Sequence, residues 1–435
     1  MLGNLFNKIN LNAKITLNTL IQVSEQFISA ILSFVILYFF VRAYTPEILS
    51  LLSYSESILL ISIIINQYGA ETIINKEIKE SGKVKDTFWN LMYFNWIFLV
   101  PSVAFVFLVI FFENNDSIKS ILILLPLILF SNSLNIAKNF FLATYNNWIN
   151  SIVQLFFTFI SFLTKIYLLL NDFPFEIYIH VYVLLYFISP VILLILMWKK
   201  NLLVLIKPNL SYIKSIFIKA TPFFISSLFI ILFTRIDMIM IRILSDFDQI
   251  SFYAIALKIY ILFAIIPAII VSNIYPKFVG IKDMNYFNKL LLNLYRILNI
   301  YSITIILLIL FFGKFFITFL FGPQYSSSFG ILLFLVMALF FSNFFIVTGL
   351  IINPIIFNGV KSLKRSILGF LINILLNIFL IPMFGAVGAA AATMISFMIV
   401  GLFYESFTSN SMSQFKLKLS SLNFFKYRDL LNEKI

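Results

Sequence analysis

Roughly a dozen apolar stretches fill this chain from end to end, and each is long enough to cross a lipid bilayer. A spanning helix needs about 20 apolar residues, because hydrocarbon offers backbone groups no hydrogen-bond partner and a helix pairs them internally. The mean hydropathy of +1.03 and the apolar content of 61% exceed the apolar share of about one half that is usual in soluble domains. The sequence therefore predicts an all-α membrane protein.

We predict twelve spans in two groups of six. They cover residues 15–41, 48–67, 88–112, 118–137, 149–171, 175–198, 220–243, 250–274, 293–313, 326–350, 362–381 and 384–405. The predicted domains are an N-terminal bundle at 1–198, a basic connector at 199–219, a C-terminal bundle at 220–408 and a basic tail at 409–435. An even number of crossings places both termini on one side.

Most of the 31 lysines and arginines fall in alternate gaps between the spans. Short cytoplasmic loops are enriched in these residues, so the pattern places both termini in the cytoplasm. Topology alone then explains the net charge of +13, and no nucleic-acid partner is needed.

Several classes of chemistry are excluded. The chain has no cysteine, so neither a disulfide nor thiol catalysis is possible. No Gly-rich phosphate loop is present, and the lone His180 has no set of metal-ligating residues at suitable spacing. The connectors are too short for a soluble catalytic domain. We expect no enzyme activity, no cofactor and no metal.

The two halves of the chain are similar in sequence at an offset of about 200 residues. Val41-Arg42 and a short loop end the first span, and Ile241-Arg242 and a similar loop end the seventh. Parallel repeats of this kind occur in transporters whose two bundles enclose a central cavity. We therefore expect two six-helix bundles with a cavity between them.

Ionisable residues deep in a span are costly and are tolerated mainly where they face a bundle interior or water. The candidates for the substrate cavity are Glu25, Glu56, Lys165, Arg235, Asp237 and Lys258. They could line a cavity or form structural ion pairs, and Lys165 lies close enough to an outer edge to snorkel to the headgroups.

Arg235 and Asp237 are two positions apart and cannot face each other on a helix, so each needs a partner from another helix. We expect Glu56 or Glu25 to pair with Arg235, and Lys258 to pair with Asp237.

The first span carries a polar stripe at three- and four-residue steps. Its members are Asn18, Gln22, Glu25, Gln26, Ser29 and Ser33. Such a stripe either lines water or packs against another helix through hydrogen bonds, and its length favours water. A shorter polar run, Asn373 with Asn377, fits either interpretation.

Several segments resemble a known family. They are RAYTPE at 42–47, Tyr68-Gly69-Ala70, Thr221-Pro222 followed by Arg235-Ile236-Asp237, Tyr275-Pro276-Lys277 and IPMFGAVGAAAAT at 381–393. With twelve spans and short loops, the chain resembles the Wzx-type flippases of O-antigen and polysaccharide repeat units. These belong to the multidrug/oligosaccharidyl-lipid/polysaccharide (MOP) exporter superfamily, which includes the multidrug (MATE) transporters.

The resemblance implies a protein of the bacterial inner membrane that moves oligosaccharides linked to undecaprenyl pyrophosphate to the periplasmic leaflet. It implies phosphate contacts from Arg235, Lys258 and Lys165, with Glu25, Glu56 and Asp237 as balancing or coupling groups. A polysaccharide polymerase and a chain-length regulator would be partners. Two alternatives stay open: a cation-coupled multidrug antiporter of the same superfamily, and a membrane-embedded polymerase or glycosyltransferase.

Overall fold

A computed structural model describes residues 2–81, 84–143, 147–199, 206–356, 360–407 and 411–423. These residues form helices and short connections, and no strand occurs among them. They divide into two compact units, Met1–Ile231 and Leu232–Ile435. The division falls inside one long helix, α11, beyond the predicted connector.

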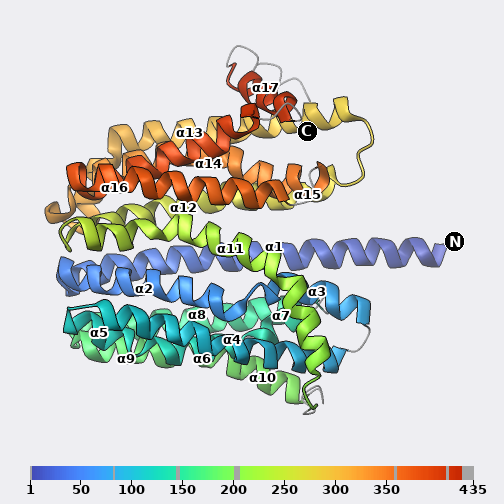
Figure 1. Cartoon of the computed structure of the whole chain (residues 1–435), viewed down its shortest axis with the longest axis horizontal. Coiled ribbons are helices and arrows are strands. Elements are labelled where there is room, and N and C mark those ends of the chain that lie inside the picture. The colour runs from blue at the N-terminus through green and yellow to red at the C-terminus, as the bar shows by residue number, and fades with distance from the viewer. Residues whose placement is uncertain are drawn as a thin grey trace. The chain divides into compact units, whose positions relative to one another are not determined.

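Within the described residues, the first unit contains ten helices before α11. Figure 1 colours them from blue to green. They are α1 (Leu2–Ala43), α2 (Pro46–Gln67), α3 (Ala70–Ser81), α4 (Val84–Phe112), α5 (Asp116–Leu122), α6 (Leu125–Leu134), α7 (Ile136–Ala143), α8 (Asn147–Leu170), α9 (Phe175–Leu185) and α10 (Ile188–Lys199). Helix α1 lies along α8, and α4 packs against α2 and α6.

The second unit begins within α11 (Leu210–Leu244) and ends with a short helix that the sequence analysis assigned to the tail. Its further elements are α12 (Gln249–Phe278), α13 (Met284–Phe321), α14 (Ser328–Val347), α15 (Asn353–Ile356), α16 (Val360–Phe397) and α17 (Met412–Ser421). Two π-helical turns, η2 (Thr348–Ile352) and η3 (Met398–Phe403), follow α14 and α16, and the 3₁₀ turn η4 (Tyr404–Phe407) follows η3. Helix α14 packs against α12, α13 and α16 (Figure 1).

The predicted spans are confirmed as apolar helices. Eleven helical segments of the described chain are long and apolar enough to cross a membrane, and the last of them covers Lys361–Phe407. That segment reverses at Gly385, whose φ of 58° is not helical. Asn373 Nδ2 donates to Thr393 Oγ1 at 3.2 Å, although a straight helix would hold residues twenty apart about 30 Å from each other. The segment is therefore two crossings, which makes twelve.

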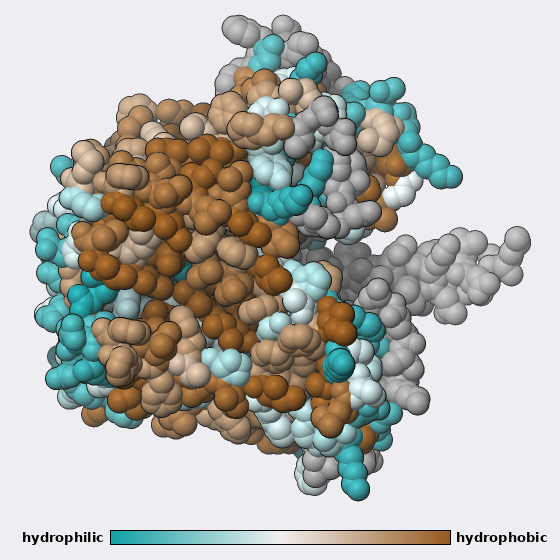
Figure 2. Space-filling model, viewed as in Figure 1, coloured by the Kyte–Doolittle hydropathy of each residue, from teal (hydrophilic) through white to brown (hydrophobic). Residues whose placement is uncertain are grey.

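The outer surface is that of a membrane protein. On the face that Figure 2 shows, apolar residues cover the middle of the helices and hydrophilic residues gather toward their ends. Large apolar side chains of the molecule, Phe111, Phe311 and Phe319 among them, are exposed. Hydrocarbon is the environment that such a surface requires.

Buried amides tie the helices of each unit together. In the first unit, Asn66 of α2 donates to the carbonyl of Asn95 in α4 and to Ser133 Oγ in α6. In the second, Asn343 of α14 donates to Ser302 Oγ in α13 at 2.6 Å. Hydrogen bonds of this kind join spanning helices where the hydrophobic effect between them is absent.

The turn after α2 packs tightly against the first part of α11. Tyr68 adopts a left-handed conformation, and its ring stacks on Phe98 and Phe224 with centroids 4.0 and 4.1 Å away. Gly69 follows with φ +74°, and a Cβ there would lie 2.8 Å from the carbonyl oxygen of Ala220. This position needs glycine both for its backbone angle and for the close approach of α11.

We predict that Gly69→Ala destabilises the protein more than Gly280→Ala. Both glycines have positive φ, but a Cβ at Gly280 would meet nothing within 4 Å. Gly280→Ala should lower the free energy of unfolding by about 1 kcal/mol, through backbone strain alone. Gly69→Ala adds a steric clash, so its loss of free energy of unfolding should be larger than that of Gly280→Ala by about 1–3 kcal/mol. Thermal unfolding of the two purified variants in the same detergent measures this, and equal melting temperatures would contradict the tight packing.

Candidate functional site

Asp237 lies in α11 and is only 1% exposed, in the centre of a hydrogen-bonded cluster inside the second unit. Its Oδ1 accepts from Asn377 Nδ2 at 2.8 Å, and its Oδ2 accepts from Thr393 Oγ1 at 2.6 Å. Oδ2 also accepts from the hydroxyl of Tyr253. All three hydrogen-bond donors are neutral groups.

A second layer holds these donors in place. Asn377 Nδ2 also donates to Asn373 Oδ1 at 3.1 Å, and Asn373 in turn donates to Thr393. The groups come from α11, α12 and both limbs of α16, so the reversal at Gly385 is what brings Thr393 beside Asn373 and Asn377. We name Asp237, Tyr253, Asn373, Asn377 and Thr393 the Asp237 cluster.

The Asp237 cluster has the chemistry of a site for a proton or a small hard cation. Carboxylate, hydroxyl and amide oxygens suit such ions, and the buried Oδ1 of Asn377 has no hydrogen-bond partner. Among the residues described, no group of three or more His, Cys, Asp and Glu side chains gathers to hold a metal ion. The cluster therefore offers one negative charge with neutral oxygens.

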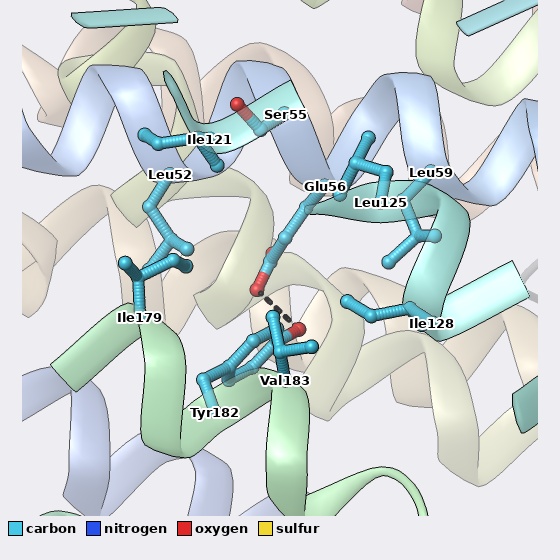
Figure 3. A pocket seen from close by; sticks show the side chains of 10 residues that line it. All are labelled: Leu52, Ser55, Glu56, Leu59, Ile121, Leu125, Ile128, Ile179, Tyr182 and Val183. Carbon is cyan, nitrogen blue, oxygen red and sulfur yellow. Dashed lines mark hydrogen bonds between the residues drawn. The ribbon is translucent and has the colours of Figure 1, made fainter. Parts of the chain in front are cut away.

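Glu56 lies in the first unit, at a small pocket with an empty volume of about 260 Å³. Figure 3 shows its carboxylate pointing from α2 toward Tyr182 of α9, whose hydroxyl donates to Oε1 at 3.5 Å. The hydroxyls of Tyr182 and Tyr186 are 3.1 Å apart. The other lining residues come from α2, α5, α6 and α9 and are Leu52, Ser55, Leu59, Ile121, Leu125, Ile128, Ile179 and Val183.

Lys165 of α8 also contacts Tyr182. Its Nζ lies 4.3 Å from the centre of the Tyr182 ring, a cation–π contact. The structure thus brings Lys165 and Glu56 to the two sides of one tyrosine. Lys165 is half-buried at this ring, and its reach to the headgroups stays a prediction.

The polar stripe of α1 divides between exposed and bonded positions. Ser29 Oγ lies 3.5 Å from Thr158 Oγ1 of α8, whereas Gln26 and Ser33 are exposed. Glu25 is partly buried, and Lys138 is an opposite charge that acts on it. The side chains of Asn18 and Gln22 lie outside the described part of the chain. At Ser29, therefore, the stripe serves helix packing.

Arg235 and Lys258 are half-buried, in α11 and α12 of the second unit. Arg235 acts electrostatically on Tyr253, so it borders the Asp237 cluster. Lys258 is not among the hydrogen-bond donors to Asp237, although the sequence analysis paired the two. The pairing of Arg235 with Glu25 or Glu56 would join the two units and stays a prediction.

Sequence reasoning missed Tyr253, Tyr182 and Tyr186, because tyrosines are common here and give no spacing signal. Asn373 and Asn377 did carry one, since residues four apart lie on one helix face. Thr393 ends the small-residue run at 381–393, but only the reversal of the chain shows that it faces the two asparagines.

The sequence model of the polysaccharide biosynthesis protein family matches residues 15–282, which is more than half of this chain. No curated protein sequence matches it significantly.

Solved structures share its fold. A lipid II flippase, MurJ, in an inward closed conformation matches with a TM-score of 0.68 and 17% identity, covering 96% of this chain and 94% of that one. An inward-facing multidrug resistance MATE transporter of the MOP superfamily matches at 0.63 and 12% identity, covering 92% and 94%. A MOP superfamily transporter from Pyrococcus furiosus matches at 0.54 and 11% identity, covering 94% of each chain. The predicted MOP/MATE-like fold is confirmed.

We predict that Thr393→Val lowers the free energy of unfolding by about 1.5–3 kcal/mol, because it removes a hydrogen bond to a buried carboxylate without changing the shape of the side chain. Thr164→Val is the matched control, since Thr164 Oγ1 bonds only the carbonyl of Ile160 in its own helix. Chemical unfolding of both variants measures the difference. Equal effects would mean that Thr393 does not support Asp237.

Proposed function

Because this chain belongs to the polysaccharide biosynthesis protein family, we propose that it is a flippase for oligosaccharide repeat units linked to undecaprenyl pyrophosphate. The observation that carries the proposal is the match to this family over residues 15–282. The likeness to flippase and transporter folds over more than nine tenths of the chain supports it.

The physical problem is the head group. A sugar pyrophosphate is charged and hydrated, so it cannot cross hydrocarbon unaided, whereas the polyprenyl tail is stable there. A hydrated path between two helical bundles can carry the head while the tail stays in lipid. Rocking of one bundle against the other would expose this path to each side in turn.

The direction follows from topology. With the basic gaps in the cytoplasm, both termini lie inside, and the repeat unit is taken up at the cytoplasmic leaflet and released at the periplasmic leaflet of the inner membrane. A polymerase and a chain-length regulator would then act on the released O-antigen or similar unit.

Arg235 and Lys258 are our candidates for the pyrophosphate contacts, because guanidinium and ammonium groups donate charge-assisted hydrogen bonds to phosphate oxygens. Both lie in spanning helices of the second unit. Lys165 is a weaker candidate, since its ammonium already lies over the Tyr182 ring.

Asp237 is our candidate for coupling transport to a cation or a proton. Its carboxylate is buried and its hydrogen-bond donors are neutral, so binding a positive charge would relieve the cost of an ionised group in a dry site. Ion binding would then favour one arrangement of the helices that supply the cluster.

Arg235→Ala and Lys258→Ala should each abolish surface polysaccharide while protein abundance in the membrane stays normal. Lys314→Ala is the control, because Lys314 is exposed near the outer end of α13 and should leave polysaccharide unchanged. Immunoblots of surface polysaccharide and of the protein measure the outcome. If both variants display wild-type polysaccharide, the phosphate assignment is wrong. If polysaccharide export is intact and drug tolerance falls instead, the result favours the multidrug antiporter.

Asp237→Asn should abolish the dependence of transport on a cation gradient while leaving the fold intact, because asparagine preserves the shape but carries no charge. The measurement is flipping of a lipid-linked oligosaccharide in proteoliposomes, with and without imposed sodium or proton gradients. Asp246→Asn is the control, since Asp246 lies in the loop after α11. Coupling that persists in Asp237→Asn would exclude this carboxylate as the ion site.

A further inference from the structure

Each unit has a helical segment that follows its sixth crossing and packs back onto it. Residues 210–219, at the start of α11, follow the six crossings of the first unit, and α17 follows the six crossings of the second. Since even-numbered crossings end on the same side of a membrane, both segments lie on the side that carries the termini.

The two segments are alike in sequence at an offset of 202 residues, which is close to the offset of the internal repeat. The first helix begins Leu-Ser-Tyr-Ile-Lys at 210–214, and α17 begins Met-Ser-Gln-Phe-Lys at 412–416. Asn209 precedes the first and Ser411 the second, both of them residue types that start helices well. Asn209 accepts a hydrogen bond from the Tyr212 amide, as a helix cap does.

In the first segment, the apolar face packs on the core of its own unit. Ile213, Ile216 and Ala220 are buried there, together with side chains of α3, α4 and α7. Lys219 Nζ then donates to Glu77 Oε1 at 2.7 Å, and the Tyr212 hydroxyl donates to Oε2 at 2.9 Å. The Glu77 side chain is only 6% exposed, so this bond satisfies a buried carboxylate.

A lysine–glutamate bond also attaches α17, and this bond is more deeply buried. Leu417 packs on the core that Leu294 and Leu298 of α13 help to form. Lys418 Nζ donates to Glu405 Oε2 at 2.6 Å, and the side chains of Lys418 and Glu405 are 0% and 4% exposed. Asn299 of α13 completes the attachment by donating to Ser421 Oγ at 3.2 Å.

The π-helical turns lie next to this attachment. Lys418 Nζ also donates to the carbonyl of Gly401, within η3. Arg365 makes the second contact to Glu405, at 3.5 Å, and donates at 2.7 Å to the carbonyl of Phe345, just before η2. The two cations therefore donate to backbone carbonyls next to or within the turns where the regular helix is interrupted.

We propose that 210–219 and α17 are matching latch helices, each holding the terminus-side end of its own unit through a lysine bonded to a buried glutamate. The second latch fixes the ends of α13 and η3 and is opened by loss of the negative charge of Glu405. Each latch acts on the conformation of its own unit, whatever the protein transports.

Glu405→Gln should open the α17 latch, because Arg365 and Lys418 would then be two buried cations without a carboxylate. The chain has no native cysteine, so one introduced cysteine reports the opening. Ser421→Cys is the reporter, since Ser421 is 0% exposed, and Ser420→Cys on the exposed side of α17 gives the rate of an accessible thiol. We expect Glu405→Gln to raise the labelling of Cys at 421, relative to 420, by about tenfold or more.

A second substitution tests whether the two side chains act on each other. Adding Lys418→Met to Glu405→Gln removes one of the two cations and should return the labelling rate toward that of the parent protein by several-fold. Lys416→Met is the matched control, because Lys416 is exposed two residues away. Equal labelling of the two double variants would overturn the latch, as would rapid labelling of Cys at 421 in the parent protein.

A pH titration tests the same contact without changing the cluster. Burial lowers the pKa of Lys418 from 10.5 to about 8 despite the opposing effect of Glu405. The other ionisable groups that face the pair are Arg365, Tyr404 and Tyr295. The open latch returns Lys418 to water and to its usual pKa, so the open form holds more protons between these two values. Rising pH in this window therefore favours the closed latch.

Labelling at 421 relative to 420 should fall roughly tenfold or more between about pH 7 and about pH 9.5 and should show no such fall in Lys418→Met. A fall of the same size in Lys418→Met would assign the effect to another group and overturn the role of this lysine.

The first latch is tested in the same way with Ile213→Cys as the reporter. Lys219→Met should raise its labelling above that of the control Lys214→Met, by a smaller factor because the Lys219 side chain is 52% exposed. If Lys219→Met has no effect, the two segments are not functionally equivalent.

Discussion

The cost of placing a charge in hydrocarbon governs this molecule. Spanning helices satisfy their own backbone groups, so the side chains decide which helices must meet. The buried carboxylates of Glu77, Asp237 and Glu405 are each met by donors from other helical segments. These carboxylates differ in the charge of the groups that donate to them, and this charge distinguishes a candidate ion-coupling site from a structural contact.

Asp237 and Glu405 illustrate the contrast within the second unit. Glu405 is met by two cations, Arg365 and Lys418, so its negative charge is balanced within the protein and one positive charge is left over. Asp237 is met by the side chains of Tyr253, Asn377 and Thr393, which donate hydrogen bonds but bring no charge. A balanced group gains little from an added ion, whereas an unbalanced one gains a great deal. This is the physical reason for placing ion coupling at Asp237 and conformational locking at Glu405.

The internal repeat extends beyond the spans. Sequence similarity at an offset of about 200 residues already suggests two related bundles, and the segments that follow each bundle add a further correspondence. Lys219 reaches Glu77 and Lys418 reaches Glu405, each on the bundle that precedes it in the chain. At an offset of 202, Lys219 corresponds to Ser421 and Lys418 to Ile216, so neither the lysines nor their glutamate partners are at matching positions of the repeat. The attachment, rather than the particular carboxylate, is what the two halves have in common.

The sequence by itself determined the all-α membrane class, the twelve crossings and the resemblance to polysaccharide flippases. The length and spacing of apolar stretches are local properties of the sequence, and a bilayer requires a helix wherever such a stretch crosses it. It also marked the costly ionisable positions, Glu56, Lys165 and Asp237 among them. Only the tertiary structure decided what surrounds them. Thr393 and Asn377 meet at Asp237 because the chain reverses at Gly385, and Tyr182 meets Glu56 and Lys165 because α9 packs beside α2 and α8. Such contacts join residues far apart in sequence through helix packing, and no local pattern specifies which faces of two helices will touch.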